Sequence, residues 1–244
     1  MVDACVSGVA IHVQHKDPFA TLQETQNVRL MPEPKSWVPP YFGAEPGVAG
    51  IVSLQGTVLF KFLRRVEEDM QCRIVACAFA AMAEMHEAGV FHLDASAGNI
   101  IVTGHFADIT RASDAATFEH DGIKHDVYFI DFATAVVPDA PVELQTLFDA
   151  DVANTFGRYG YGQWHEYAPG GRCNGRASDV PCLAVSIMTT LGIDCKLMRK
   201  MKEIIPYPLT SVKEVGTSRT FKRYLLDHTQ AVPSAREAFD ILMK

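Results

Sequence analysis

Residues 92–102 read HLDASAGNIIV, and residues 127–131 read VYFID. In the first stretch, Asp94 and Asn99 lie in a polar turn ahead of a short apolar strand. In the second, a buried strand ends on Asp131. If these two strands pair, Asn99 and Asp131 come close together, on the same edge as Asp94.

Asp94, Asn99 and Asp131, if grouped in this way, could bind a metal ion and accept a proton. Carboxylate and amide oxygens suit Mg²⁺, which takes a few protein oxygens together with phosphate and water. A further carboxylate can accept a proton from an attacking hydroxyl. The pattern therefore indicates phosphoryl transfer. The alternative that these residues leave open is three polar side chains that only cap turns.

Composition narrows the function further. The chain has 244 residues, of which 48% are hydrophobic, so it can bury a sizeable core and is not a disordered chain. Its 22 basic and 29 acidic residues give a net charge of −7, which argues against an extended nucleic-acid surface. The most apolar stretch, residues 74–85, is too short to span a membrane.

The expected location is cytoplasmic. The first residues lack a long apolar run, so we expect no secretory signal. The six cysteines show no CxxC spacing, which favours reduced thiols over a disulfide framework or a zinc site.

The order of predicted elements indicates an α+β fold with two lobes. Residues 1–54 form a small, sheet-rich N-lobe with one helix at 19–31, and residues 55–244 form a mainly helical C-lobe. The expected strands of the N-lobe cover residues 9–13, 37–42 and 48–54. The expected helices of the C-lobe cover residues 67–88, 180–190, 196–203, 218–228 and 235–243. Residues 103–125 are expected to form a loop.

Residues 92–99 resemble the HxDxxxxN catalytic loop of the protein-kinase-like superfamily, and residues 130–133 (IDFA) resemble its metal-binding DFG element. Further similarities follow in the same order along the chain. Residues 82–92 are similar to the end of the long C-lobe helix, residues 167–169 lie where an APE element would, and residues 233–238 resemble the start of the terminal helix.

The resemblance implies a role for each residue of the pattern. Asp94 would be the catalytic base or would orient the attacking hydroxyl, and Asn99 and Asp131 would hold Mg²⁺ on the phosphates of ATP. Asp179 would support the backbone of the catalytic loop from the helix below. A plain cap at the start of that helix is a second interpretation of Asp179, which is compatible with the first.

The N-lobe departs most from the family. A glycine-rich phosphate loop is missing, and His12 occupies the place of the phosphate-binding lysine. Lys16 lies nearby, and Glu24 is either the helix partner of the missing lysine or an exposed helical residue, which we favour. Ser96 replaces the lysine two residues after Asp94, as in small-molecule kinases of the superfamily. The expected nucleotide-binding set is therefore His12, Lys16, Glu24 and Ser96.

Two further departures concern the C-lobe. Leu93 replaces the arginine that pairs with a phosphorylated activation loop, so no such switch is expected. Asp131 lies 37 residues after Asp94 (131 − 94), about twice the usual interval, with the surplus in residues 103–125.

The chain thus resembles a minimal or N-terminally truncated member of the superfamily. It is either an ATP- and Mg²⁺-dependent phosphotransferase or a pseudokinase that binds a partner protein. The predicted partners are a nucleotide and a phosphoacceptor, either a protein or a small molecule, with neither nucleic acid nor membrane.

Overall fold

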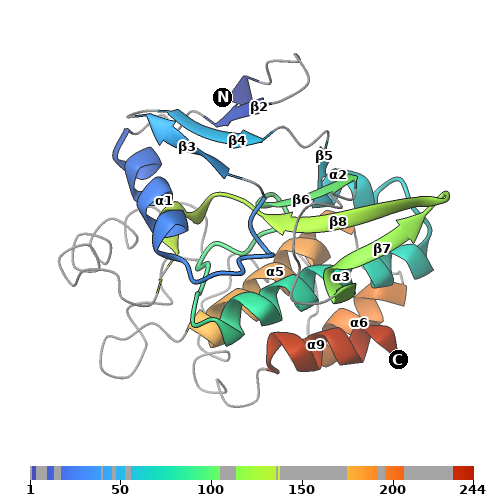
Figure 1. The fold of residues 1–244 in the computed structure, drawn as a ribbon. Coiled ribbons are helices and arrows are strands. Elements are labelled where there is room, and N and C mark those ends of the chain that lie inside the picture. The colour runs from blue at the N-terminus through green and yellow to red at the C-terminus, as the bar shows by residue number, and fades with distance from the viewer. Residues whose placement is uncertain are drawn as a thin grey trace.

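The computed structural model describes residues 2–3, 10–13, 18–39, 41–45, 48–52, 56–104, 114–135, 137, 175–191, 196–205 and 233–244. Two four-stranded antiparallel sheets and a group of helices make up this part of the chain. Figure 1 shows the first sheet beside helix α1 and the second sheet above the helical core. The expected α+β class is confirmed.

The first sheet has the strand order β1-β2-β4-β3. Its strands are β1 (Val2–Asp3), β2 (Ala10–Val13), β3 (Tyr41–Glu45) and β4 (Val48–Val52), and α1 (Pro18–Leu30) connects β2 to the next hairpin. The strands expected at residues 9–13 and 48–54 and the helix at 19–31 are confirmed. The strand expected at 37–42 begins only at Tyr41, because residues 36–38 turn before two prolines that restrict the backbone.

The second sheet has the order β5-β6-β8-β7 and carries both halves of the predicted site. Its strands are β5 (Gly56–Val58), β6 (Ile100–Gly104), β7 (Thr117–His120) and β8 (Ile123–Phe129). Strands β6 and β8 pair in antiparallel register from Ile100 opposite Phe129 to Gly104 opposite His125. The pairing expected between the two quoted stretches is therefore confirmed.

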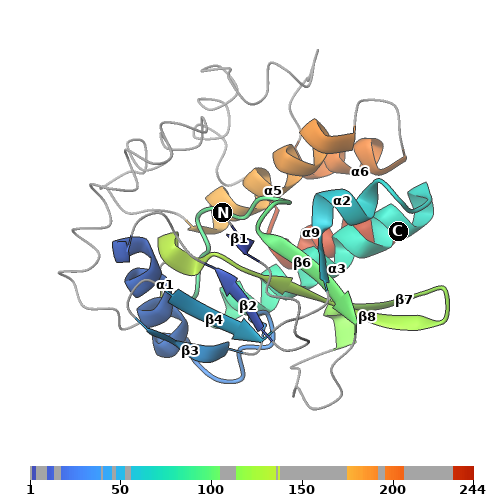
Figure 2. The same ribbon diagram turned by 90° about the horizontal axis from the view of Figure 1, so that it is seen from above.

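The expectation that residues 103–125 form a loop is wrong over much of this stretch, because β7 and β8 form a hairpin there. Asp121 and Gly122 connect the strands and both have positive φ, 52° and 73°. Asp-Gly with both residues in this region is the turn that matches the twist of a two-residue hairpin. Figure 2 shows the hairpin extending away from α1 and the first sheet.

The helical core is built around α3 (Glu68–Glu87), which is buried along most of the segment from Cys72 to Met85. The helix ends at Glu87 and is followed by Gly89, whose φ of 77° suits glycine just after a helix C-terminus. Around it lie α2 (Leu59–Leu63), α5 (Gly175–Leu191), α6 (Lys196–Ile204) and α9 (Ala235–Met243). The helices expected at 67–88, 180–190, 196–203 and 235–243 are confirmed, and the one at 218–228 lies outside the described residues.

Three of the cysteines, Cys72, Cys77 and Cys182, are buried. Among the described helices, none combines the length and apolar character that crossing a membrane requires.

Helix α9 packs against α3 and begins with a capping box. The Ser234 hydroxyl accepts a hydrogen bond from the Glu237 backbone N–H at 3.2 Å, and the Glu237 carboxylate accepts one from the Ser234 backbone N–H at 2.7 Å. We expect Ser234→Ala to lower the free energy of unfolding by about 1 kcal/mol, because a backbone donor loses its partner. Urea denaturation measures the change. Ser234→Thr, which keeps the hydroxyl, is the control, and equal losses in both variants would contradict a capping role.

Candidate active site

The segment from His92 to Asn99 joins α3 to β6 and forms a compact loop. The Ser96 N–H donates to the Asp94 carbonyl at 2.8 Å, and the Asn99 N–H donates to the Ser96 carbonyl at 2.9 Å. Ser186 of α5 accepts a hydrogen bond from the Ala97 N–H through its hydroxyl at 2.9 Å. The loop is therefore held both by its own turns and by the helix beneath it.

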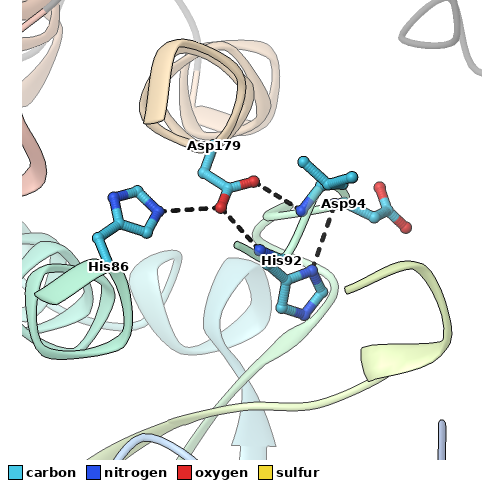
Figure 3. Close-up of polar contacts among 5 residues, drawn as sticks. His86, His92, Asp94 and Asp179 are labelled. Atoms are coloured by element: carbon cyan, nitrogen blue, oxygen red, sulfur yellow. Dashed lines mark hydrogen bonds and ion pairs between the residues drawn. The ribbon is translucent and has the colours of Figure 1, made fainter. Parts of the chain in front are cut away.

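Asp179 is the main support of this loop. It is fully buried on α5, and its carboxylate accepts hydrogen bonds from the His92 N–H at 2.8 Å and the Leu93 N–H at 2.7 Å. His86 Nε2 lies 3.0 Å from the same carboxylate (Figure 3). Because α5 starts at Gly175, Asp179 is not its N-terminal cap. The expected support of the loop is confirmed, and the capping alternative is wrong.

The support from Asp179 holds Leu93 in an unusual backbone conformation. The φ of Leu93 is 63°, a left-handed conformation that a side chain with a Cβ rarely adopts. The two hydrogen bonds from Asp179 hold the peptide groups on either side of His92, immediately before Asp94. A backbone strained in this way persists only where surrounding contacts hold it.

His92 links the loop to the residue that precedes Asp131. Its Nδ1 accepts a hydrogen bond from the Asp94 N–H at 3.3 Å, and its Nε2 lies 2.9 Å from the Ile130 carbonyl. A carbonyl only accepts, so Nε2 carries a hydrogen in this contact. The ring is fully buried, 4.9 Å from the Phe132 ring between centroids.

Asp94 and Asn99 are in direct contact. Asn99 Nδ2 donates to the Asp94 carbonyl at 3.0 Å and to Asp94 Oδ2 at 2.9 Å. Burial raises the pKa of Asp94 from its ordinary 3.8 to about 6. His92 and the Asn99 hydrogen bond oppose this shift, while the negative charges of Asp131 and Asp179 add to it. A carboxyl with such a pKa can gain and lose a proton near neutral pH.

Asp131 follows β8 and lies next to this pair. The Ile130 N–H donates to the Asn99 carbonyl at 2.9 Å, which extends the β6–β8 pairing to the edge of the site. Asp131 has a φ of 64° and begins a short 3₁₀ turn, η2 (Phe132–Thr134). The predicted proximity of Asn99 and Asp131 is therefore present.

The donor set fits a magnesium ion that is shared with phosphate. Asn99 uses its amide nitrogen on Asp94, so its Oδ1 is directed elsewhere, and Asp131 supplies a carboxylate. In the described part of the chain, no group of three or more His, Cys, Asp or Glu could hold a metal ion alone. Mg²⁺ commonly binds through one or two protein carboxylates together with substrate phosphates, so two protein ligands suffice.

The expectation of an exposed Glu24 is wrong. Glu24 is 2% exposed, and its Oε1 accepts a hydrogen bond from the Phe132 N–H at 3.2 Å. The helical pattern identifies α1 but does not say which polar side chains point inward, because that depends on a segment 108 residues away. Three residues further along α1, Asn27 also contacts this turn, and its spacing from Glu24 places both on one face of the helix.

Of the other predicted nucleotide-binding residues, only some lie in the described part of the chain. His12 lies on β2 opposite Gly50, and its side chain is outside the described part. Lys16 and residues 167–169 also lie outside the described residues. Ser96 is half-buried within the loop beside Asp94.

In comparisons by sequence, no protein-family model and no curated protein matches the chain. In structure, the chain is similar to that described as "Crystal structure of Rad53 kinase domain and SCD2", with a TM-score of 0.53 and 14% identity over 100% of this chain and 82% of the other. It is also similar to "WaaP in complex with acyl carrier protein", with 15% identity over 98% and 88% of the two chains, but a TM-score of only 0.43. At these identities the first likeness shows the fold alone.

Proposed function

Because the chain has a protein-kinase-like fold, we propose that it is a phosphotransferase that moves the γ-phosphate of ATP, with Mg²⁺, to a hydroxyl of a protein or small molecule. The observation that carries this proposal is the pairing of Asp94 with Asn99 at 2.9 Å, beside Asp131. A scaffold has no chemical need for a half-buried carboxylate with a pKa of about 6 at this position.

Each residue has a role in this proposal. Asp94 accepts or orients the proton of the attacking hydroxyl, and Asn99 and Asp131 hold the metal. Mg²⁺, when bound, neutralises charge on the phosphates. Nucleotide contacts come from the set His12, Lys16, Glu24 and Ser96.

We also propose that the nucleotide lies between two lobes, residues 1–54 and 55–244. The division falls between β4 and β5, so each lobe contains one of the two sheets. Asp94, Asn99 and Asp131 then belong to the larger lobe, and His12, Lys16 and Glu24 belong to the smaller one.

A pseudokinase that binds a partner protein is the second candidate, and one observation favours it. His12 lies on β2 where the family has a lysine, and an imidazole supplies less positive charge at neutral pH than an ammonium group. Loss of this cation should lower the rate of phosphoryl transfer, because the reaction depends mainly on positioning and charge stabilisation.

Thermal denaturation with ATP and Mg²⁺ tests nucleotide binding. Ligand at 100 times its dissociation constant adds about 2.7 kcal/mol to the folded state. For a chain of this size we expect an upward shift of roughly 5–10 °C, which requires Mg²⁺ and disappears in Asp131→Asn. Asp114→Asn, which removes an exposed carboxylate that is not part of the proposed site, is the matched control. The absence of a shift in the parent would overturn nucleotide binding.

A further inference from the structure

Asn27 of α1 reaches across to the turn that follows Asp131. Its side-chain nitrogen donates to the Phe132 carbonyl at 2.8 Å and to the Ala135 carbonyl at 3.1 Å, and it lies 3.4 Å from the Ala133 carbonyl. The side chain is 2% exposed. We call these contacts of Asn27 with the Phe132 and Ala135 carbonyls the clasp. It joins two segments more than 100 residues apart in the sequence.

The geometry uses the full donor capacity of the amide. A side-chain amide has two hydrogens, and the two shorter contacts go to the carbonyls on either end of the turn. The Ala135 N–H also donates to the Phe132 carbonyl at 3.1 Å, so the clasp binds around a closed turn. Glu24, one helical turn earlier, accepts the Phe132 N–H. The backbone of Phe132 is therefore held by α1 on both sides, through its N–H and through its C=O.

The residue in front of this turn is strained. Asp131 is not glycine, yet it has a φ of 64°, and it comes directly before the clasped Phe132. Such a conformation persists where neighbouring contacts fix the following backbone. If the turn is released, Asp131 can relax to a common conformation, and its carboxylate then leaves the neighbourhood of Asp94 and Asn99.

We infer that Asn27 is a positioning residue, which ties α1 to the turn after Asp131 and thereby keeps the Asp131 carboxylate directed at the metal position. The inference rests on the proposed function, since it concerns the Mg²⁺ that Asp131 would hold. Asn27 makes no contact with the nucleotide in this role. The side chain therefore affects the metal-dependent part of nucleotide binding and not the metal-independent part.

Two measurements on the full chain test this role in Asn27→Ala and in Asn27→Asp, which keeps the shape but loses both donors. Hydrogen exchange reports the Phe132 and Ala135 amides, and titration with ATP, with and without Mg²⁺, reports the metal-dependent gain in affinity. Losing two hydrogen bonds should speed exchange and reduce that gain by roughly tenfold or more. Affinity for ATP without Mg²⁺ should stay at the parent value. Gln26→Ala, at an exposed neighbour on the same helix, is the control.

The possible outcomes distinguish failure of the positioning role of Asn27 from failure of the proposed phosphotransferase function. Unchanged exchange in the Asn27 variants, or faster exchange with an unchanged Mg²⁺ effect, overturns the positioning role while the proposed function stands. A parent that gains no affinity from Mg²⁺ overturns the proposed function, and the positioning role falls with it. If neither variant folds, hydrogen exchange in the parent protein, measured with and without Mg²⁺ and ATP, tests the inference. Protection of residues 131–135 by Mg²⁺ and ATP must then be accompanied by protection of α1, and protection of the turn alone overturns the inference.

Discussion

Replacing Asp179 by alanine is expected to lower the free energy of unfolding by about 3–5 kcal/mol, the largest stability effect of any single substitution in the site. The substitution leaves the buried N–H groups of His92 and Leu93 without their acceptor, and each unsatisfied donor costs about 1–3 kcal/mol. It also removes the partner of His86 Nε2. Urea denaturation at neutral pH measures the loss.

The control for this prediction is Asp114→Ala, which removes an exposed carboxylate and should change stability by no more than about 0.5 kcal/mol. Asp179→Ala should also release the strained backbone at Leu93 and move the adjacent Asp94. A variant whose stability lies within 1 kcal/mol of the parent, roughly the worth of one hydrogen bond, would contradict the assigned support.

The second large effect is on phosphate transfer. We expect Asp94→Asn to lower kcat by roughly 10²–10⁴-fold, because the amide cannot accept the proton of the attacking hydroxyl. The substitution is nearly isosteric and keeps an oxygen for the Asn99 hydrogen bond, so the fold should be retained. Radiolabelled ATP with a panel of hydroxyl acceptors measures transfer. Parent-level transfer by the variant would remove Asp94 from the mechanism.

The same substitution has a pH-dependent effect on stability. The folded pKa of Asp94, about 6, is above its unfolded value of 3.8, so the folded state holds the extra proton between these pH values. Stability is therefore lost as the pH rises through this window, by about 3 kcal/mol once both states are ionised. Without Mg²⁺, Asp94→Asn should be more stable than the parent at pH 7.5, and the difference should shrink toward pH 4. Asp69→Asn, at an exposed position, should show no such trend.

Local signals in the sequence were enough to predict much of the fold. Gly89 follows the end of α3, and Ser234 and Glu237 begin α9, because these effects act within one helical turn. The pairing of β6 with β8 was also predictable, since two short apolar strands flank the polar residues of the site. The Asp121-Gly122 turn carries a hairpin signal of the same local kind, but it lies in a stretch rich in polar residues, which is more typical of a loop.

The site was predictable only where it follows a compact motif. The support from Asp179 agreed with the resemblance, whereas the burial of Glu24 did not follow from the pattern of α1. Asn27 went unnoticed for the same reason. A helical periodicity describes the apolar face, but a buried polar side chain is recognised only from its partner, and here the partner lies over 100 residues away.

The β7–β8 hairpin has a consequence for how such chains are recognised. Strands β6 and β8 pair from Ile100 opposite Phe129 at the site end to Gly104 opposite His125 at the other end, and the residues between Gly104 and His125 are not part of this pairing. Length can therefore be added at the far end of the sheet without altering the separation of Asn99 and Asp131. The interval between the two motifs thus carries little information about chemistry. A search pattern with a fixed interval excludes chains of this kind, whereas a pattern based on strand pairing includes them.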